Sequence, residues 1–108
     1  MYKSDTIDKV VELIVAAAAP EKVVLFGSRA RGNNNEQSDV DILILKKHLK
    51  NTRKLTGNLY RTFLKENIKI PIDLVALDYG KYDSLKNETG YIYKTIAKEG
   101  KVLYEQLH

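Results

Sequence analysis

The sequence has no cysteine among its 108 residues. Disulfide bonds and thiolate metal sites are therefore excluded, and a reducing compartment is the expected environment. Every uninterrupted apolar run is far shorter than the ~20 residues that a transmembrane helix requires. The first residues, Met1 to Asp5, lack the basic-then-apolar order of a signal peptide. We therefore expect a cytoplasmic protein that does not enter a membrane.

Internal repeats, low-complexity tracts and linker-like segments are lacking too, so we expect one domain over residues 1–108. Apolar residues make up 44% and charged residues 30%, which excludes a disordered tail. The net charge of +4 permits an anionic ligand but does not demonstrate one. Basic residues crowd the segment from Lys46 to Lys54. A solvated surface and a phosphate or nucleic-acid contact are both open interpretations of that segment.

Helix and strand patterns alternate along the chain. Apolar residues recur on one face of each expected helix, and the strands are short, apolar and β-branched in part. The order predicts an α/β (α+β) fold, a small mixed β-sheet of three to four strands with helices packed mainly on one face. Helices are expected near residues 4–19, 51–66 and 83–99, and strands at Lys22–Phe26, Asp39–Leu45, Ile70–Leu77 and Lys101–Glu105.

Single residues refine this pattern. The strand Lys22–Phe26 is apolar on both faces, which predicts a central position in the sheet. Pro71 indicates an edge strand or a strand opening, and the residues from Asp78 to Gly80 are expected to form a turn. Gly90 could divide the last helical region in two. Gly100 is expected to end it in a left-handed cap.

The stretch from Gly27 to Asp41 contains the first group of candidate site residues. Gly27 and Ser28 follow a strand and open a short helical turn, so their free backbone N–H groups suit a triphosphate. Ser28 adds a hydroxyl donor, and Arg29 and Arg31 add positive charge. A plain strand-ending turn is the alternative for Gly27. For at least one of the two arginines, surface solvation is the alternative.

Three aspartates occupy unusual positions. Asp39 and Asp41 are expected on one face of a strand, because side chains alternate along it. Asp41 borders an apolar run, and Asp73 lies inside another, where an unpartnered carboxylate is costly. One shared partner would explain all three. Oxygen ligands without cysteine favour a hard cation, Mg²⁺ or Mn²⁺.

The alternatives for these residues are a helix or turn cap for Asp39 and a buried ion pair with lysine or arginine for Asp73. If the metal interpretation is right, a triphosphate would meet a two-metal site on Asp39 and Asp41. Asp73 could ligate the second ion or accept the incoming proton. The products would be a nucleotidyl adduct and pyrophosphate. We expect no role for His48 or His108.

The sequence of these motifs resembles that of the nucleotidyltransferase superfamily of DNA polymerase β. The matching segments cover nearly the whole chain, and the small size is similar to that of the minimal nucleotidyltransferases, the MNT group. The segments that carry the resemblance are Phe26 to Ser28, Gly27 to Gly32, Asp39 to Asp41, Ile72 to Leu74, and Ile96 to Glu105.

This resemblance implies a polymerase-β-like fold and an antitoxin encoded beside a HEPN-domain ribonuclease toxin. It implies transfer of AMP from ATP to a tyrosine of that toxin, with two Mg²⁺ ions as cofactors. Gly27 and Ser28 would bind the nucleotide phosphates. Asp39, Asp41 and Asp73 would form the metal-binding and catalytic triad, and none of these five positions departs from the family pattern.

Two other functions stay open. The chain could neutralise a toxin by binding alone, or it could transfer a nucleotide to a small molecule such as an aminoglycoside. The intact aspartates favour transfer over binding alone. The expected partners are a nucleoside triphosphate and a HEPN toxin in a hetero-oligomer, and we do not expect direct nucleic-acid binding.

Five tyrosines lie close together late in the chain. They could cover the edge of the core, or they could form a surface for a partner, because tyrosine is favoured at interfaces. These residues are Tyr79, Tyr82, Tyr91, Tyr93 and Tyr104.

Overall fold

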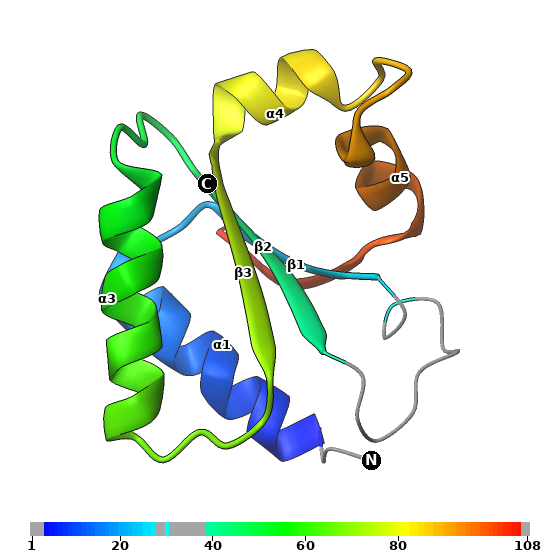
Figure 1. The fold of residues 1–108 in the computed structure, drawn as a ribbon. Coiled ribbons are helices and arrows are strands. Elements are labelled where there is room, and N and C mark those ends of the chain that lie inside the picture. The colour runs from blue at the N-terminus through cyan, green and yellow to red at the C-terminus, as the bar shows by residue number, and fades with distance from the viewer. Residues whose placement is uncertain (1–3, 28–29, 31–38, 107–108) are drawn as a thin grey trace.

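A computed structural model describes residues 4–27, 30 and 39–106. Helices and strands are interspersed through these residues, as the sequence pattern predicts (Figure 1). No helix in the described ranges is long and apolar enough to cross a membrane. The elements are α1 (Ser4–Ala18), β1 (Lys22–Phe26), β2 (Val40–Lys46), α3 (Thr52–Lys65), β3 (Ile72–Asp78), α4 (Tyr79–Leu85), α5 (Ile92–Glu99) and β4 (Lys101–Glu105).

The four strands form one mixed sheet in the order β3-β2-β1-β4. β1 runs antiparallel to both β2 and β4, whereas β2 and β3 are parallel. The predicted central position of β1 is confirmed, and so is the edge position of β3 after Pro71. Because β2 and β3 are parallel, their first residues lie at the same end of the sheet, next to the last residue of β1.

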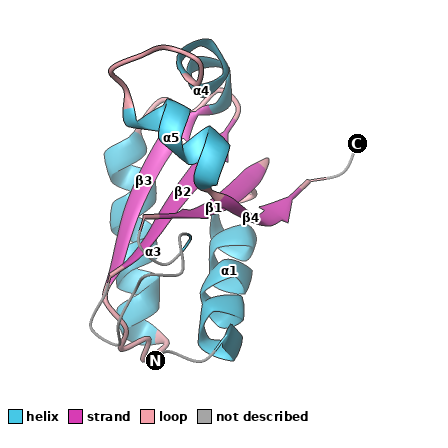
Figure 2. Cartoon of the chain, turned by 90° about the vertical axis from the view of Figure 1, so that its right-hand side faces the viewer, coloured by secondary structure: helices cyan, strands magenta, loops and turns pink. Residues whose placement is uncertain are grey.

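Helices cover both faces of the sheet (Figure 2). The long helices α1 and α3 pack on one face around a first core that includes Ile14, Ile42 and Leu59. The short helices α4 and α5 pack on the other face around a second core that includes Phe26, Leu43 and Ile96. The α/β fold class is confirmed, but the expectation that the helices pack mainly on one face is wrong, because two helices cover each face. Because both faces are covered, the run of β2 from 42 to 45 is fully buried.

The expected turn at Asp78 is wrong, because the helix begins there. Asp78 is the N-cap of α4, and its Oδ2 accepts the Lys81 backbone N–H at 3.2 Å. Its Oδ1 accepts the Leu49 backbone N–H at 3.1 Å, which ties α4 to the connector after β2. A capping aspartate satisfies donors that a helix start otherwise leaves free. The division at Gly90 is confirmed, since α4 and α5 are separate helices.

The left-handed cap expected at Gly100 is also wrong. Gly100 has φ −68° and ψ 153°, an extended conformation that any residue adopts. Glycine is needed at this position because there is no room for a side chain. A Cβ at this position would lie 2.6 Å from the Ile96 carbonyl oxygen and 2.7 Å from Val24 Cγ1. The missing side chain therefore lets the end of α5 approach β1 closely.

Candidate functional site

Two of the predicted aspartates lie side by side. Asp41 of β2 is the register partner of Asp73 of β3. Register partners on parallel strands point to the same face, and neighbouring strands are roughly 4.8 Å apart. This face is the one that α4 and α5 cover, because Leu43 and Val75, two residues further along each strand, belong to the second core or pack against it. The two carboxylates therefore lie beside each other at one end of the sheet.

Asp39 precedes β2 and is exposed. The Val40 N–H donates to the Pro71 carbonyl at 2.9 Å, which ties the start of β2 to the segment before β3. Asp39 is thereby held at the same end of the sheet as Asp41 and Asp73. In the described part of the chain, no backbone N–H donates to the Asp39 carboxylate. The alternative of a turn cap thus has no support there.

Asp73 is exposed, although the apolar sequence around it suggests burial. Asp73 is exposed because it lies near the start of an edge strand. A side chain at this position is not covered by the helices and can reach solvent. No lysine or arginine among the described residues pairs with it. Because Asp73 is exposed, the alternative of a buried ion pair is wrong. An exposed carboxylate beside a second carboxylate remains to be explained.

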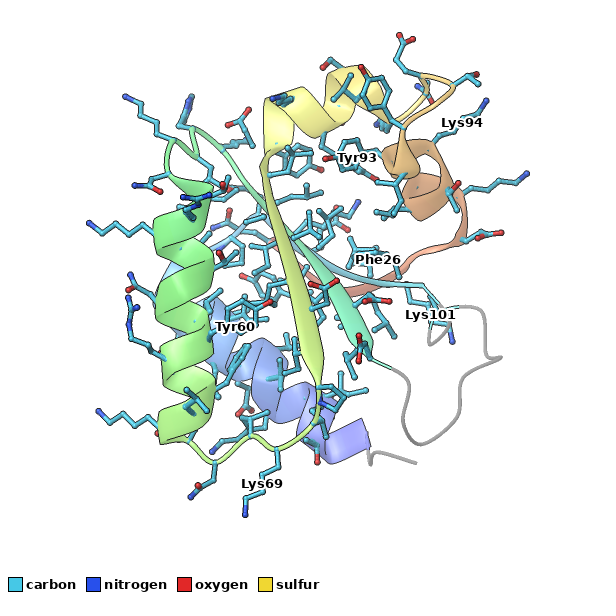
Figure 3. The ribbon with its side chains drawn as sticks, viewed as in Figure 1. Phe26, Tyr60, Lys69, Tyr93, Lys94 and Lys101 are labelled. Atoms are coloured by element: carbon cyan, nitrogen blue, oxygen red, sulfur yellow. The ribbon has the colours of Figure 1, made fainter. Side chains whose placement is uncertain are left out.

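The peptide that follows Asp73 is held by a tyrosine. The backbone N–H of Leu74 donates to the Tyr60 hydroxyl oxygen at 2.8 Å, in a partly buried setting. Figure 3 shows Tyr60 on the side of α3 that faces the sheet. Its ring also packs edge-to-face on Phe63, with centroids 6.4 Å apart. Sequence reasoning missed Tyr60, because it lies outside the apolar stripe of Leu55, Leu59 and Phe63.

Gly27 brings its backbone against Asp41. Its φ is +75°, a left-handed value that residues with a side chain rarely adopt. A Cβ at this position would overlap Asp41 Oδ2 and would lie 3.2 Å from Asp41 Cγ. The alternative of a plain turn is thus insufficient, since glycine also meets a packing requirement. The predicted residues Ser28, Arg29 and Arg31 lie outside the described residues.

A small cavity of about 180 Å³ opens beside Gly27 and Asp41. Its other wall is α5, which contributes Ile92, Thr95 and Glu99. The sequence analysis did not select these α5 residues as site residues. Their spacing shows that they share one face of a helix, but nothing in the sequence places α5 next to β1.

The donor chemistry of the site fits a hard divalent cation. Asp41 and Asp73 offer adjacent carboxylate oxygens, and Asp39 is a third donor at the same end. Across residues 4–27, 30 and 39–106, no three His, Asp or Glu side chains already form a group that could hold a metal ion. The predicted triad of Asp39, Asp41 and Asp73 is therefore not a preformed three-ligand group in these residues, and the phosphates of a substrate would have to supply further oxygen ligands, as is usual for Mg²⁺.

A larger cavity, of about 500 Å³, lies at the opposite end of the sheet. Lys47 and His48 of the predicted basic segment line it, together with acidic side chains that include Glu21 and Asp78. The Lys47 backbone N–H donates to the Glu21 carboxylate at 2.9 Å. The Glu21 and Asp78 carboxylates already accept backbone N–H groups within the fold, and the cavity is separated from Asp41 by the length of β2.

The tyrosines fall into two groups. Tyr82 is 7% exposed, and Tyr79, Tyr93 and Tyr104 pack against the two cores. For these four the interpretation as a core edge is confirmed. Tyr91 is 52% exposed and stacks on Tyr93, with ring centroids 6.4 Å apart. A partner surface at Tyr91 stays a prediction.

Residues 8–108 match the family model described as polymerase beta, nucleotidyltransferase. The chain is similar to a protein adenylyltransferase of Aphanizomenon flos-aquae, MntA, with 34% identity over 84 residues. That similarity covers 78% of this chain and 56% of MntA. The chain spans about half the length of the curated relatives it matches.

The fold is similar to that of two solved toxin–antitoxin structures. One is an MntA–HpeT complex, with a TM-score of 0.64 and 20% identity over 92% of this chain and 73% of the other. The second is a toxin–antitoxin with AMP-PNP, with a TM-score of 0.61 and 21% identity over 97% of this chain and 75% of the other. At these identities the likeness shows the fold alone.

Proposed function

The chain belongs to the polymerase β nucleotidyltransferase family, and on this basis we propose that it is a protein adenylyltransferase that acts as an antitoxin. It transfers AMP from ATP to a tyrosine of a partner HEPN-domain ribonuclease toxin. The observation that carries the proposal is the register pairing of Asp41 with Asp73. An edge-strand carboxylate next to a second carboxylate contributes nothing to stability, so it favours a chemical role.

The phosphates are proposed to lie against Gly27. Its backbone reaches Asp41 without a side chain between them, so a triphosphate at this turn would have its α-phosphorus near the aspartates. Ser28, Arg29 and Arg31 are proposed to bind the phosphates further along the same turn. Asp39, Asp41 and Asp73 would hold Mg²⁺, which supplies charge neutralisation and Lewis-acid polarisation of the phosphate oxygens when it is bound.

The reaction is a displacement at the α-phosphorus. The acceptor tyrosine oxygen forms the new bond to phosphorus, the bond to the bridging oxygen breaks, and pyrophosphate leaves. The phenol proton goes to a carboxylate oxygen of Asp73, which is exposed and therefore open to an incoming side chain. The name of the relative MntA and the toxin–antitoxin structures of similar fold support a protein as the acceptor.

The test uses α-labelled ATP, Mg²⁺ and the purified HEPN toxin. Wild type should label the toxin, and Asp41→Asn and Asp73→Asn should reduce labelling by at least about 100-fold. Asp8→Asn, an exposed aspartate on α1, is the matched control and should label normally. If both site variants still silence the toxin ribonuclease fully, neutralisation by binding alone is the right account.

A further inference from the structure

One side of α5 faces the proposed phosphate turn. Residues 92, 95, 96 and 99 are spaced as neighbours on one helix face. Ile96 is buried at 3% exposure and faces the second core. Ile92 is 57% exposed, and Thr95 and Glu99 are exposed as well. An apolar side chain, a hydroxyl and a carboxylate are thus presented together on the exposed side of α5.

These side chains form a wall of the small cavity. The opposite wall is the end of β1 and the start of β2, with Phe26, Gly27 and Asp41. Figure 3 shows Phe26 on the side of the sheet that α5 covers. Gly100 fixes the distance between the walls, because it lets the end of α5 touch β1. The cavity thus has an apolar floor of Phe26 and Ile96 and a polar rim.

The size of the cavity limits what can occupy it. Its volume of about 180 Å³ is smaller than the ~300–1,000 Å³ of pockets that enclose a whole drug-sized ligand. It can take one part of a ligand whose remainder lies outside. Because Gly27 and Asp41 line both the cavity and the proposed phosphate site, that part would be joined directly to the α-phosphate.

The charge of the rim decides which part enters. Glu99 is acidic and belongs to the α5 wall, so it disfavours the phosphates of ATP there, whereas the charge of Asp41 would be neutralised by Mg²⁺. The nucleoside end is neutral, has a flat apolar ring, and carries hydroxyl and amino donors that a carboxylate can accept. We propose that this cavity binds the nucleoside end of ATP, with Glu99 and Thr95 as its polar contacts and Ile92 against the ring. The inference rests on the proposed function, since that function places the phosphates.

The experiment separates the two ends of the substrate. Adenosine and inorganic tripolyphosphate are added one at a time, with Mg²⁺ present in both titrations, to ¹⁵N-labelled protein. Adenosine should shift the amide signals of Thr95 and Glu99, and tripolyphosphate should shift that of Gly27. Glu99→Gln and Thr95→Val should each weaken adenosine binding at least about fivefold. Neither variant should weaken tripolyphosphate binding. Glu88→Gln, an exposed glutamate outside the cavity, is the matched control.

Three outcomes have distinct meanings. If adenosine leaves the α5 signals unmoved, the nucleoside lies elsewhere and the inference is wrong. The same holds if both α5 variants bind adenosine as Glu88→Gln does. If adenosine shifts α5 but no labelled AMP reaches the toxin, the nucleoside cavity is supported and the proposed transfer fails.

Discussion

Asp41 lies directly opposite Asp73 on adjacent parallel strands, and both side chains point to the face that carries α5. Like charges in such a pair destabilise a sheet, by less than about 1 kcal/mol when they are exposed. The fold tolerates this cost at the end of the sheet where Gly27 also has a left-handed backbone. The like-charge pair and the left-handed turn at Gly27 thus meet at one end of the sheet.

The first prediction is that the Asp73 carboxylate lowers stability. Asp73→Asn should raise the free energy of unfolding in the absence of Mg²⁺, by less than about 1 kcal/mol, because it removes the repulsion with Asp41. Urea titration of both proteins measures it. The same variant should lose transfer to the toxin. A decrease in stability of more than about 1 kcal/mol would contradict the repulsion and indicate a structural role.

The second prediction concerns Gly27. Gly27→Ala should lower the free energy of unfolding by about 1–3 kcal/mol, because the new Cβ requires a strained φ and overlaps Asp41. Gly57→Ala is the matched control. Gly57 lies within α3 with only Arg61 Nη1 near its Cβ position, at 3.8 Å, so alanine should stabilise that helix by up to about 1 kcal/mol. Equal effects of the two substitutions would contradict this account.

The third prediction is that Tyr60 positions Asp73. Tyr60→Phe keeps the ring on Phe63 but leaves the Leu74 N–H without its acceptor. Stability should fall by about 0.5–1.5 kcal/mol, and hydrogen exchange at Leu74 should accelerate. The kcat for transfer should fall while the KM for ATP stays unchanged, since Gly27 is untouched. Asp8→Asn, which alters an exposed side chain of α1, should change none of these values. If Tyr60→Phe has a normal kcat but fast hydrogen exchange at Leu74, Tyr60 has a structural role and does not position Asp73.

The sequence predicted most of the elements because their causes are local. β2 is an apolar run that is covered on both faces, and α3 begins at Asn51, whose side chain accepts the Lys54 N–H at 3.0 Å. The missed features have causes that are distant in sequence. The need for glycine at Gly100 comes from Val24, and the role of Tyr60 comes from Leu74. That Asp39 and Asp41 share one face stays a prediction, because Asp39 precedes β2 and strand alternation does not extend to it.

The register of Asp73 against Asp41 could not be predicted from the sequence. Nothing in either strand specifies that they are parallel or which residues pair. The pattern located three unusual carboxylates, and the sheet topology brought Asp41 and Asp73 together. The resemblance of the motifs supplied the family, which the match over residues 8–108 confirmed.

The fourth prediction tests Tyr91 as a contact for the toxin. Its ring is 52% exposed, and its neighbour Ile92 is 57% exposed, so both can reach a partner. Tyr91→Ala should weaken toxin binding by about fivefold or more, that is about 1 kcal/mol, in a calorimetric titration. Tyr60→Ala is not a suitable control, because Tyr60 holds β3. Leu64→Ala is suitable, because Leu64 is 77% exposed on α3 and lies away from α5. If Tyr91→Ala binds the toxin with unchanged affinity, Tyr91 is not part of a toxin-binding surface.

The last prediction is the pH dependence of the Asp78 cap. The Lys81 backbone N–H above all, and then that of Leu49, hold the pKa of the Asp78 carboxyl below its usual range. A carboxyl whose pKa is lower in the folded state stabilises the fold above its unfolded pKa of about 3.9, and this stabilisation is lost as the pH falls through the folded pKa. Asp78→Ala should therefore be less stable than wild type at about pH 7, and the difference should narrow below about pH 4. Urea titrations of both proteins at several pH values measure this, with Asp8→Ala, which changes an exposed aspartate of α1, as the matched control. The result that would contradict this is a stability difference between Asp78→Ala and wild type that stays constant down to low pH. The side chain would then act through packing. Its charged hydrogen bonds would contribute nothing to holding α4 against the connector after β2.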